Sequence, residues 1–122
     1  MTKSKVIFEE LNKLGIPTNL SGRGYIEDAL DLMLADSEYF SNVSGKLYPE
    51  IAEQNNATAK NISQAIRNAI ENAVARSSAN TWGEYFGSTL ARTKVKPTNS
   101  EFLTMVARRI ALEEANNVHN QN

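Results

Sequence analysis

Hydrophobic residues recur at three- and four-residue intervals along most of the chain, which is the spacing of amphipathic helices. The pattern predicts helices over residues 5–14 and 23–35, around residues 47–52, over 58–76 and 82–86, and from residue 98 onward. No stretch alternates as a strand would. We therefore expect an all-α fold: one compact six-helix domain over residues 1–115 that contains a helix-turn-helix, followed by a disordered tail over residues 116–122.

Local signals predict several helix ends. Thr98 and Glu101 have the spacing of a capping box, in which the side chain of each residue accepts a hydrogen bond from the backbone amide of the other. Thr58 is a good N-cap for the long helix, and Ser21 is a plausible N-cap for the second helix. Gly87 ends the short aromatic helix.

The expected core comes from the same spacing. The last helix is predicted to bury Phe102, Met105, Val106, Ile110 and Leu112. The aromatic residues Trp82, Tyr85 and Phe86 are predicted to lie in the core, because no basic residues are interleaved with them as in a base-stacking surface.

Residues 44–76 have the pattern of a short helix, a polar turn and a longer helix with two different faces. Apolar residues at helical spacing fall on one face, namely Ile62, Ala65, Ile66, Ala69, Ile70 and Ala73. The other face carries Lys60, Asn61, Ser63, Gln64, Arg67 and Asn68. Such side chains near a helix N-terminus are typical of a recognition helix in a DNA major groove, and the alternative is a helical hairpin with a solvated polar face.

Charge supports this interpretation through its distribution. The net charge is −1, but residues 1–57 carry nine acidic and five basic side chains, whereas residues 58–109 carry eight basic and three acidic ones. The positive half therefore contains the candidate recognition helix. The absence of cysteine fits a reducing cytoplasm, and no apolar run is long enough to span a membrane. We expect a bacterial cytoplasmic protein that associates with the nucleoid when bound to DNA.

Four segments resemble one known family. LYPEIA (47–52), AIRNAIENA (65–73), YFGSTLARTK (85–94) and KPTNSEF (96–102) are similar to the C-terminal effector domain of stage-zero sporulation protein A, the response regulator of sporulation. The resemblance runs from about Ile7 to Leu112, and KPTNSEF is its most specific part.

The resemblance implies an all-helical, helix-turn-helix domain that binds double-stranded DNA as a homodimer on tandem sites. It also implies a contact with an RNA polymerase sigma factor, through the exposed part of residues 75–84. In the family this domain follows a phosphorylatable receiver domain. These 122 residues contain none, which predicts either a fragment or a stand-alone relative.

The resemblance also assigns site residues, with one departure from the family pattern. The family helix resembles A-S-R-V-E-R-A-I-R-H-A-I; here Ser63 and Gln64 replace its Glu-Arg pair, and Asn61 and Asn68 replace its first Arg and its His. We predict base reading by Asn61, Ser63, Gln64 and Arg67, and phosphate contacts by Thr58, Lys60, Asn68, Lys94 and Lys96. Because Gln pairs with adenine and Arg with guanine, Gln64 predicts a shift from G toward A. The alternatives are a merely solvated Gln64 and an Arg67 that pairs with Glu71.

Enzyme chemistry has little support in the sequence. His119 is the only histidine and has no nucleophile pattern near it, and Glu27, Asp28 and Asp31 lack metal-ligand spacing. We expect no catalytic residue, cofactor, metal or small-molecule substrate. The rival interpretation is a DNA-incompetent interaction module that pairs with a full-length regulator or with RNA polymerase.

Overall fold

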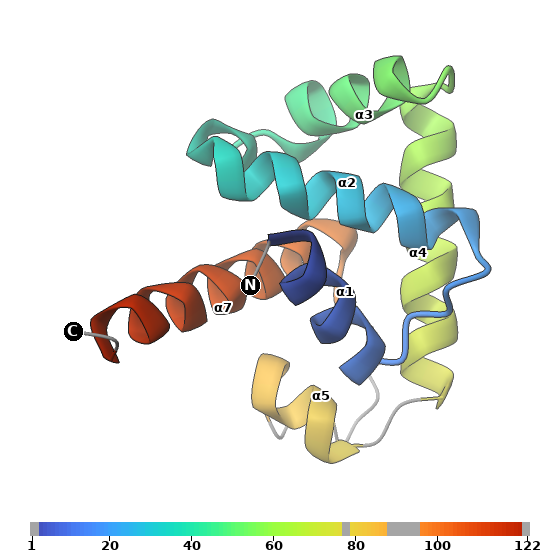
Figure 1. Ribbon diagram of the computed structural model, residues 1–122. Helices are drawn as coiled ribbons and strands as arrows, with labels where there is room; N and C mark the ends of the chain where they lie inside the picture. The colour runs from blue at the N-terminus through green and yellow to red at the C-terminus, as the bar shows by residue number, and fades with distance from the viewer. Residues whose placement is uncertain (1–2, 77–78, 88–95, 121–122) are drawn as a thin grey trace.

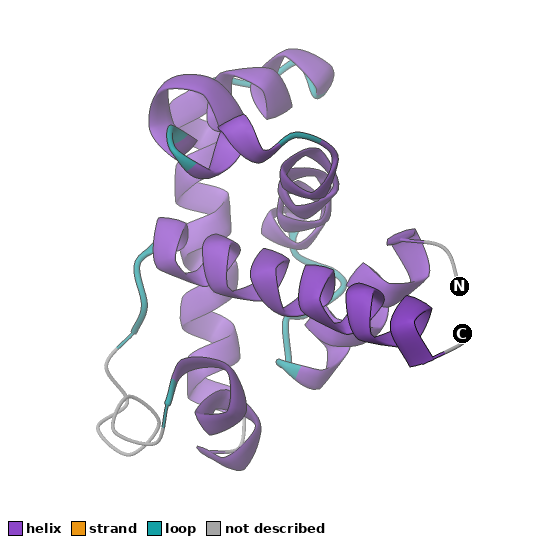
Figure 2. Cartoon of the chain, turned by 90° about the vertical axis from the view of Figure 1, so that its left-hand side faces the viewer, coloured by secondary structure: helices purple, strands orange, loops and turns teal. Residues whose placement is uncertain are grey.

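The computed structural model describes residues 3–76, 79–87 and 96–120, and these residues form six α-helices and no strand (Figures 1 and 2). The helices are α1 (Lys3–Lys13), α2 (Ser21–Ala35), α3 (Tyr48–Gln54), α4 (Ala59–Arg76), α5 (Ala79–Phe86) and α7 (Asn99–Asn120). A short 3₁₀ helix, η1 (Ser37–Phe40), and a π-helical turn, η2 (Val43–Leu47), connect α2 to α3. The prediction of an all-α domain is confirmed.

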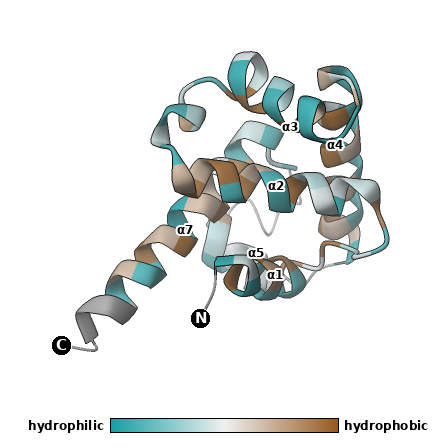
Figure 3. Ribbon diagram, turned by 45° about the horizontal axis from the view of Figure 1, so that its top comes forward, coloured by the Kyte–Doolittle hydropathy of each residue, from teal (hydrophilic) through white to brown (hydrophobic). Residues whose placement is uncertain are grey.

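Helix α2 lies at the centre and packs on α1, α4 and α7. Helix α4 runs along one side of the molecule from α3 toward α5, as Figure 1 shows. Hydrophobic and hydrophilic segments alternate along α2, α4 and α7 in Figure 3, as expected for helices with one buried face. The buried side chains form one core, whose largest fully buried members include Leu11, Ile26, Leu30, Ile51, Ile66, Ile70 and Phe102.

The glycine at the start of α2 allows that helix to approach α4 closely. An ideal Cβ atom at Gly22 would lie 2.1 Å from the carbonyl oxygen of Ala65 and 2.9 Å from Cβ of Ala69. Only a residue without a side chain fits this crossing. The orientation of α4 on the central helix therefore depends on Gly22.

The predicted N-caps are confirmed at two helices and wrong at one, and α5 ends at Phe86, just before Gly87, as predicted. Thr98 and Glu101 form the capping box, with the Glu101 amide donating to Thr98 Oγ1 at 3.1 Å and the Thr98 amide donating to Glu101 Oε1 at 2.9 Å. The α4 cap by Thr58 is described below. Ser21 is not a cap, because α2 begins one residue earlier than such a cap requires: Leu20 occupies the N-cap position and Ser21 is the first helical residue.

Two residues of α7 were predicted on the wrong face. Met105 is 41% exposed and Leu112 is 61% exposed, whereas Leu103 and Ala107 are fully buried. The buried stripe is centred on residues 102, 103, 106, 107 and 110, and Met105 and Leu112 lie nearly opposite it at seven-residue spacing. The helix also continues through Asn120, where the sequence predicted a tail from residue 116. No Gly or Pro interrupts residues 99–120, and Asn lowers helix stability by well under about 1 kcal/mol per residue.

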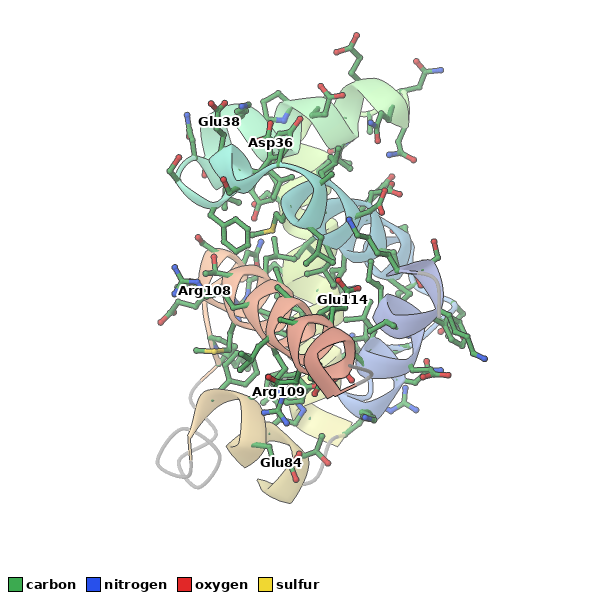
Figure 4. All side chains as sticks on the ribbon, turned by 60° about the vertical axis from the view of Figure 1, so that its left-hand side comes forward. Asp36, Glu38, Glu84, Arg108, Arg109 and Glu114 are labelled. Atoms are coloured by element: carbon green, nitrogen blue, oxygen red, sulfur yellow. The ribbon has the colours of Figure 1, made fainter. Side chains whose placement is uncertain are left out.

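Aromatic side chains join α5 to α7; Trp82 and Tyr85 are buried in the core as predicted, and Phe86 is partly buried against it. The Trp82 and Phe86 ring centroids are 5.1 Å apart, and the Phe86 and Phe102 centroids are 5.9 Å apart. Arg109 of α7 lies beside α5 in Figure 4 and donates from Nη1 to the carbonyl oxygen of Glu84 at 3.0 Å. These contacts attach α5 to the far end of the core, away from α3.

Candidate nucleic-acid interface

The turn between α3 and α4 has a defined backbone geometry. Asn56 adopts a φ of 53°, in the left-handed region that Asn tolerates better than most residues. The Ala57 amide donates to the carbonyl oxygen of Ala52 at 2.9 Å. The Asn55 side chain donates to Asp28 Oδ2 at 3.1 Å, which links the turn to α2. The direction in which α4 leaves the turn is therefore held from two sides.

Thr58 caps the N-terminus of α4, as the sequence predicted. Its Oγ1 accepts a hydrogen bond from the Asn61 amide at 3.1 Å. The amides of the first residues of a helix have no partner within it, and the helix dipole places partial positive charge there. Because Thr58 and Lys60 are exposed, this end of α4 is suited to an anionic group such as a phosphate.

An exposed stripe runs along the first half of α4. We define the α4 outer stripe as Lys60, Asn61, Gln64 and Asn68, all of which are exposed. The opposite face is buried, with Ile62, Ile66, Ala69, Ile70 and Ala73 in the core. In the described part of the chain, the side chains of the stripe form no hydrogen bond or ion pair with another residue. Their amide and ammonium groups are available to an external partner.

Ser63 and Arg67, which were predicted to read bases, lie beside this stripe and are half-buried. Both contact the segment that begins α7: Asn99 Nδ2 donates to the Ser63 carbonyl oxygen at 2.9 Å, and Arg67 Nη1 donates to the Pro97 carbonyl oxygen at 2.7 Å. The base contacts of Ser63 and Arg67 remain predictions. In this structure the two residues join α4 to α7.

Tyr48 lies behind this junction. Burial raises the pKa of its phenol, and the neighbouring side chains of Asn99 and Ser63 partly oppose that rise. The sequence reasoning assigned no role to Tyr48 or Asn99. Asn99 lies within KPTNSEF, the most specific part of the family resemblance, and its place in this motif is the sequence signal for it.

Arg67 and Lys96 share an acidic partner. Arg67 Nε lies 3.0 Å from Glu71 Oε1, and Lys96 Nζ lies 3.7 Å from Glu71 Oε2. The hydrogen bond from Arg67, followed by the charge of Lys96, lowers the pKa of the Glu71 carboxyl. The ion pair considered as the alternative for Arg67 is therefore present. Lys94, the other predicted phosphate contact of this loop, lies outside the described residues.

The acidic side chains of α2 lie in a different place. A depression of about 360 Å³ between α1 and α2 is lined by Ser4, Ile7, Phe8, Glu27, Asp28 and Asp31. Its carboxylates would repel phosphate, so the basic face of α4 is the better candidate for nucleic acid.

Residues 3–76, 79–87 and 96–120 lack two other kinds of feature. These residues contain no cluster of three or more side chains of the types that hold a metal ion. Within the same residues, no helix has the length and apolar character needed to cross a membrane.

The chain matches the model of a known protein family. The model of the family described as "Sporulation initiation factor Spo0A C terminal" matches residues 7–110 of the 122-residue chain. The matched region includes α2, α3, α4, α5 and the first half of α7. It therefore covers every residue of the candidate interface described above.

Proposed function

This chain belongs to the Spo0A C-terminal family of DNA-binding effector domains, and we propose that it regulates transcription by placing α4 in the major groove of duplex DNA. The observation that carries this proposal is the α4 outer stripe, whose side chains are exposed and have no partner among the described residues. In this proposal α3, the turn and α4 act as a helix-turn-helix, with α4 as the recognition helix.

The stripe supplies the chemistry that base and phosphate recognition require. The carboxamides of Asn61 and Gln64 each carry donors and an acceptor, so they can pair with the edge of a base, and the carboxamide of Asn68 can donate to a phosphate. Lys60 and the N-terminal end of α4 supply positive charge where the helix would enter the groove. Phosphate contacts would set the position of the helix, and the carboxamides of Asn61 and Gln64 would select the sequence.

We propose that the preferred operator differs from the usual site of the family. Where the family pattern has a Glu-Arg pair, this chain has Ser63 and Gln64. Arg favours the O6 and N7 atoms of guanine, whereas a carboxamide favours N6 and N7 of adenine. A good bidentate pair contributes about 1–3 kcal/mol of discrimination. Because Gln64 stands where the family pattern has Arg, the preference at one base pair should shift from G toward A.

This specificity can be tested by restoring the family pair. The double variant Ser63→Glu, Gln64→Arg should regain a preference for the family operator of about tenfold or more, as 1–3 kcal/mol implies. Binding selection on a randomised duplex pool would compare it with the unmodified protein. An unchanged sequence preference would contradict the assignment of Gln64. The exposed substitution Gln54→Arg on α3 is a matched control for the added charge.

The proposed assembly is two copies on tandem sites, with a sigma factor of RNA polymerase as a second partner. These partners follow from the family alone. The rival function is a module that does not bind DNA and pairs with a regulator or with polymerase. One observation favours the rival: Glu71 already neutralises part of the charge of Arg67 and Lys96.

Fluorescence anisotropy separates the two functions. The protein is titrated onto a duplex with two tandem family operators and onto a scrambled duplex, from about 50 to 200 mM salt. A DNA-binding function predicts affinity that falls steeply with salt, because neutralised phosphates release counterions. Preference for the family operator would refute the proposed change of base preference at Gln64. Salt-sensitive binding of equal strength to both duplexes would agree with that change. No binding to either duplex would overturn the DNA-binding function and favour the rival.

A further inference from the structure

Glu71 is an acidic residue on the basic face of α4. It follows Gln64 by seven residues, or two helical turns, and therefore lies on the same side of the helix as the α4 outer stripe. Its side chain is 44% exposed. A carboxylate in this place would lie close to the phosphates of DNA bound along α4.

The contacts of Glu71 connect it to both neighbouring cations. Its two carboxylate oxygens lie 3.0 Å from Arg67 Nε and 3.7 Å from Lys96 Nζ. Arg67 also donates to the Pro97 carbonyl oxygen at 2.7 Å, so its guanidinium is held between α4 and the start of α7. Lys60 has no acidic partner among the described residues. Among the described residues of this face, Lys60 is thus unpaired, whereas Arg67 and Lys96 share a single anion.

We infer that Glu71 limits the affinity of this surface for DNA of every sequence, by pairing with Arg67 and Lys96 and by repelling phosphate. The inference rests on the proposed DNA-binding function and adds a residue that sets its strength. Glu71 contacts no base in this account. Discrimination between sequences stays with Asn61 and Gln64.

The physical reason is the electrostatic origin of non-specific binding. Contacts with phosphates supply nearly all of that binding and depend on the number of charges neutralised. Removing the negative charge of Glu71 would free Lys96 to contact a phosphate and would remove a repulsive charge. One additional phosphate contact steepens the slope of log K against log salt by about 0.9. At about 0.1 M salt, this slope corresponds to an affinity increase of about five- to tenfold.

The test is the variant Glu71→Gln, with Glu9→Gln as its control. Glu9 is exposed on α1 and forms no ion pair with a described residue, so its substitution changes the net charge equally at another place. Glu71→Gln should bind operator and scrambled duplexes more tightly by the same factor, about five- to tenfold, with a steeper salt dependence. If Glu71→Gln binds no more tightly than Glu9→Gln, the inference is overturned. A gain confined to one sequence would also overturn it, because it would indicate base reading.

A second variant connects the gain to Lys96. Lys96→Ala should lower affinity less in the unmodified protein than in the Glu71→Gln background, because Glu71 competes with phosphate for that lysine. In the Glu71→Gln background, Lys96→Ala should remove much of the gain, and an undiminished gain would contradict the role of Lys96. Thermal unfolding of each variant controls for a loosened junction between α4 and α7. If the unmodified protein binds DNA and Glu71→Gln does not bind more tightly, only this inference fails. If no variant binds any duplex, the proposed function fails with it.

Discussion

The crossing of α2 and α4 at Gly22 yields a quantitative prediction about stability. A Cβ atom at this position would meet the backbone oxygen of Ala65 at 2.1 Å and the backbone carbon of the same carbonyl at 2.7 Å. Backbone atoms cannot rotate away as a flexible side chain can. Substitution Gly22→Ala would therefore force the two helices apart or shift the first turn of α2.

The magnitude follows from the size of the overlap. Restoring an ordinary contact of about 3.5 Å with the Ala65 oxygen requires a displacement of about 1.4 Å, which the packed core between the helices resists. Overpacking of this kind costs about 1–3 kcal/mol. Ala is favoured over Gly in a helix by up to about 1 kcal/mol, which offsets part of that cost. We expect Gly22→Ala to lower the free energy of unfolding by about 1–2 kcal/mol.

Gly24 provides a matched control two residues away in the same helix. It is exposed, and an added Cβ would have no atom within 4 Å. Gly24→Ala should therefore raise stability by about 0.5–1 kcal/mol through helix propensity alone. Urea unfolding followed by circular dichroism gives both values from the transition midpoints, provided that the slopes agree. The reasoning is refuted if Gly22→Ala is as stable as Gly24→Ala.

Two further predictions concern the turn and a buried carboxyl. Asn56 has a φ of 53°, a conformation that Ala adopts less readily than Asn or Gly. Asn56→Ala should therefore lower the free energy of unfolding by about 1–2 kcal/mol, whereas Asn56→Gly should not. Equal melting temperatures of the two variants would contradict this. Burial raises the pKa of the Glu10 carboxyl above the ordinary 4.5, and the nearby carboxylate of Glu113 raises it further. The stability contributed by protonated Glu10 is therefore present below pH 4.5 and is lost as the pH rises through the higher folded value. Glu10→Gln should raise the urea midpoint at pH 7 and leave it nearly unchanged near pH 4, and a lower midpoint at pH 7 would refute the assignment.

Much of the helical architecture could be predicted because its causes are local. Apolar spacing predicted every α-helix of the described residues, and the Thr58 cap and the Thr98–Glu101 capping box lie where their sequence signals indicated. The error at Ser21 arose because a cap and a first helical residue favour the same residue types. The errors at Met105 and Leu112 arose from choosing one face of α7 without knowing which helices surround it.

The candidate site could be predicted only in part. Helical spacing correctly placed Gln64 and Asn68 on an exposed face of α4. It could not show that Ser63 and Arg67 are half-buried, because the covering residues come from the start of α7, about thirty positions later in the chain. Contacts of this kind depend on tertiary packing, for which the local pattern carries no signal.

The most direct test of the central claim is a nuclear magnetic resonance titration of the ¹⁵N-labelled protein with the duplex that carries two tandem family operators. Assigned backbone and side-chain amide signals report which surface meets DNA. The account predicts that the largest shifts fall on the α4 outer stripe, including the side-chain amides of Asn61, Gln64 and Asn68. Signals of the acidic α1–α2 depression, such as those of Asp31, should remain nearly unchanged. Shifts centred on that depression, or spread evenly over the molecule, would contradict the assignment of α4 as the DNA-binding surface.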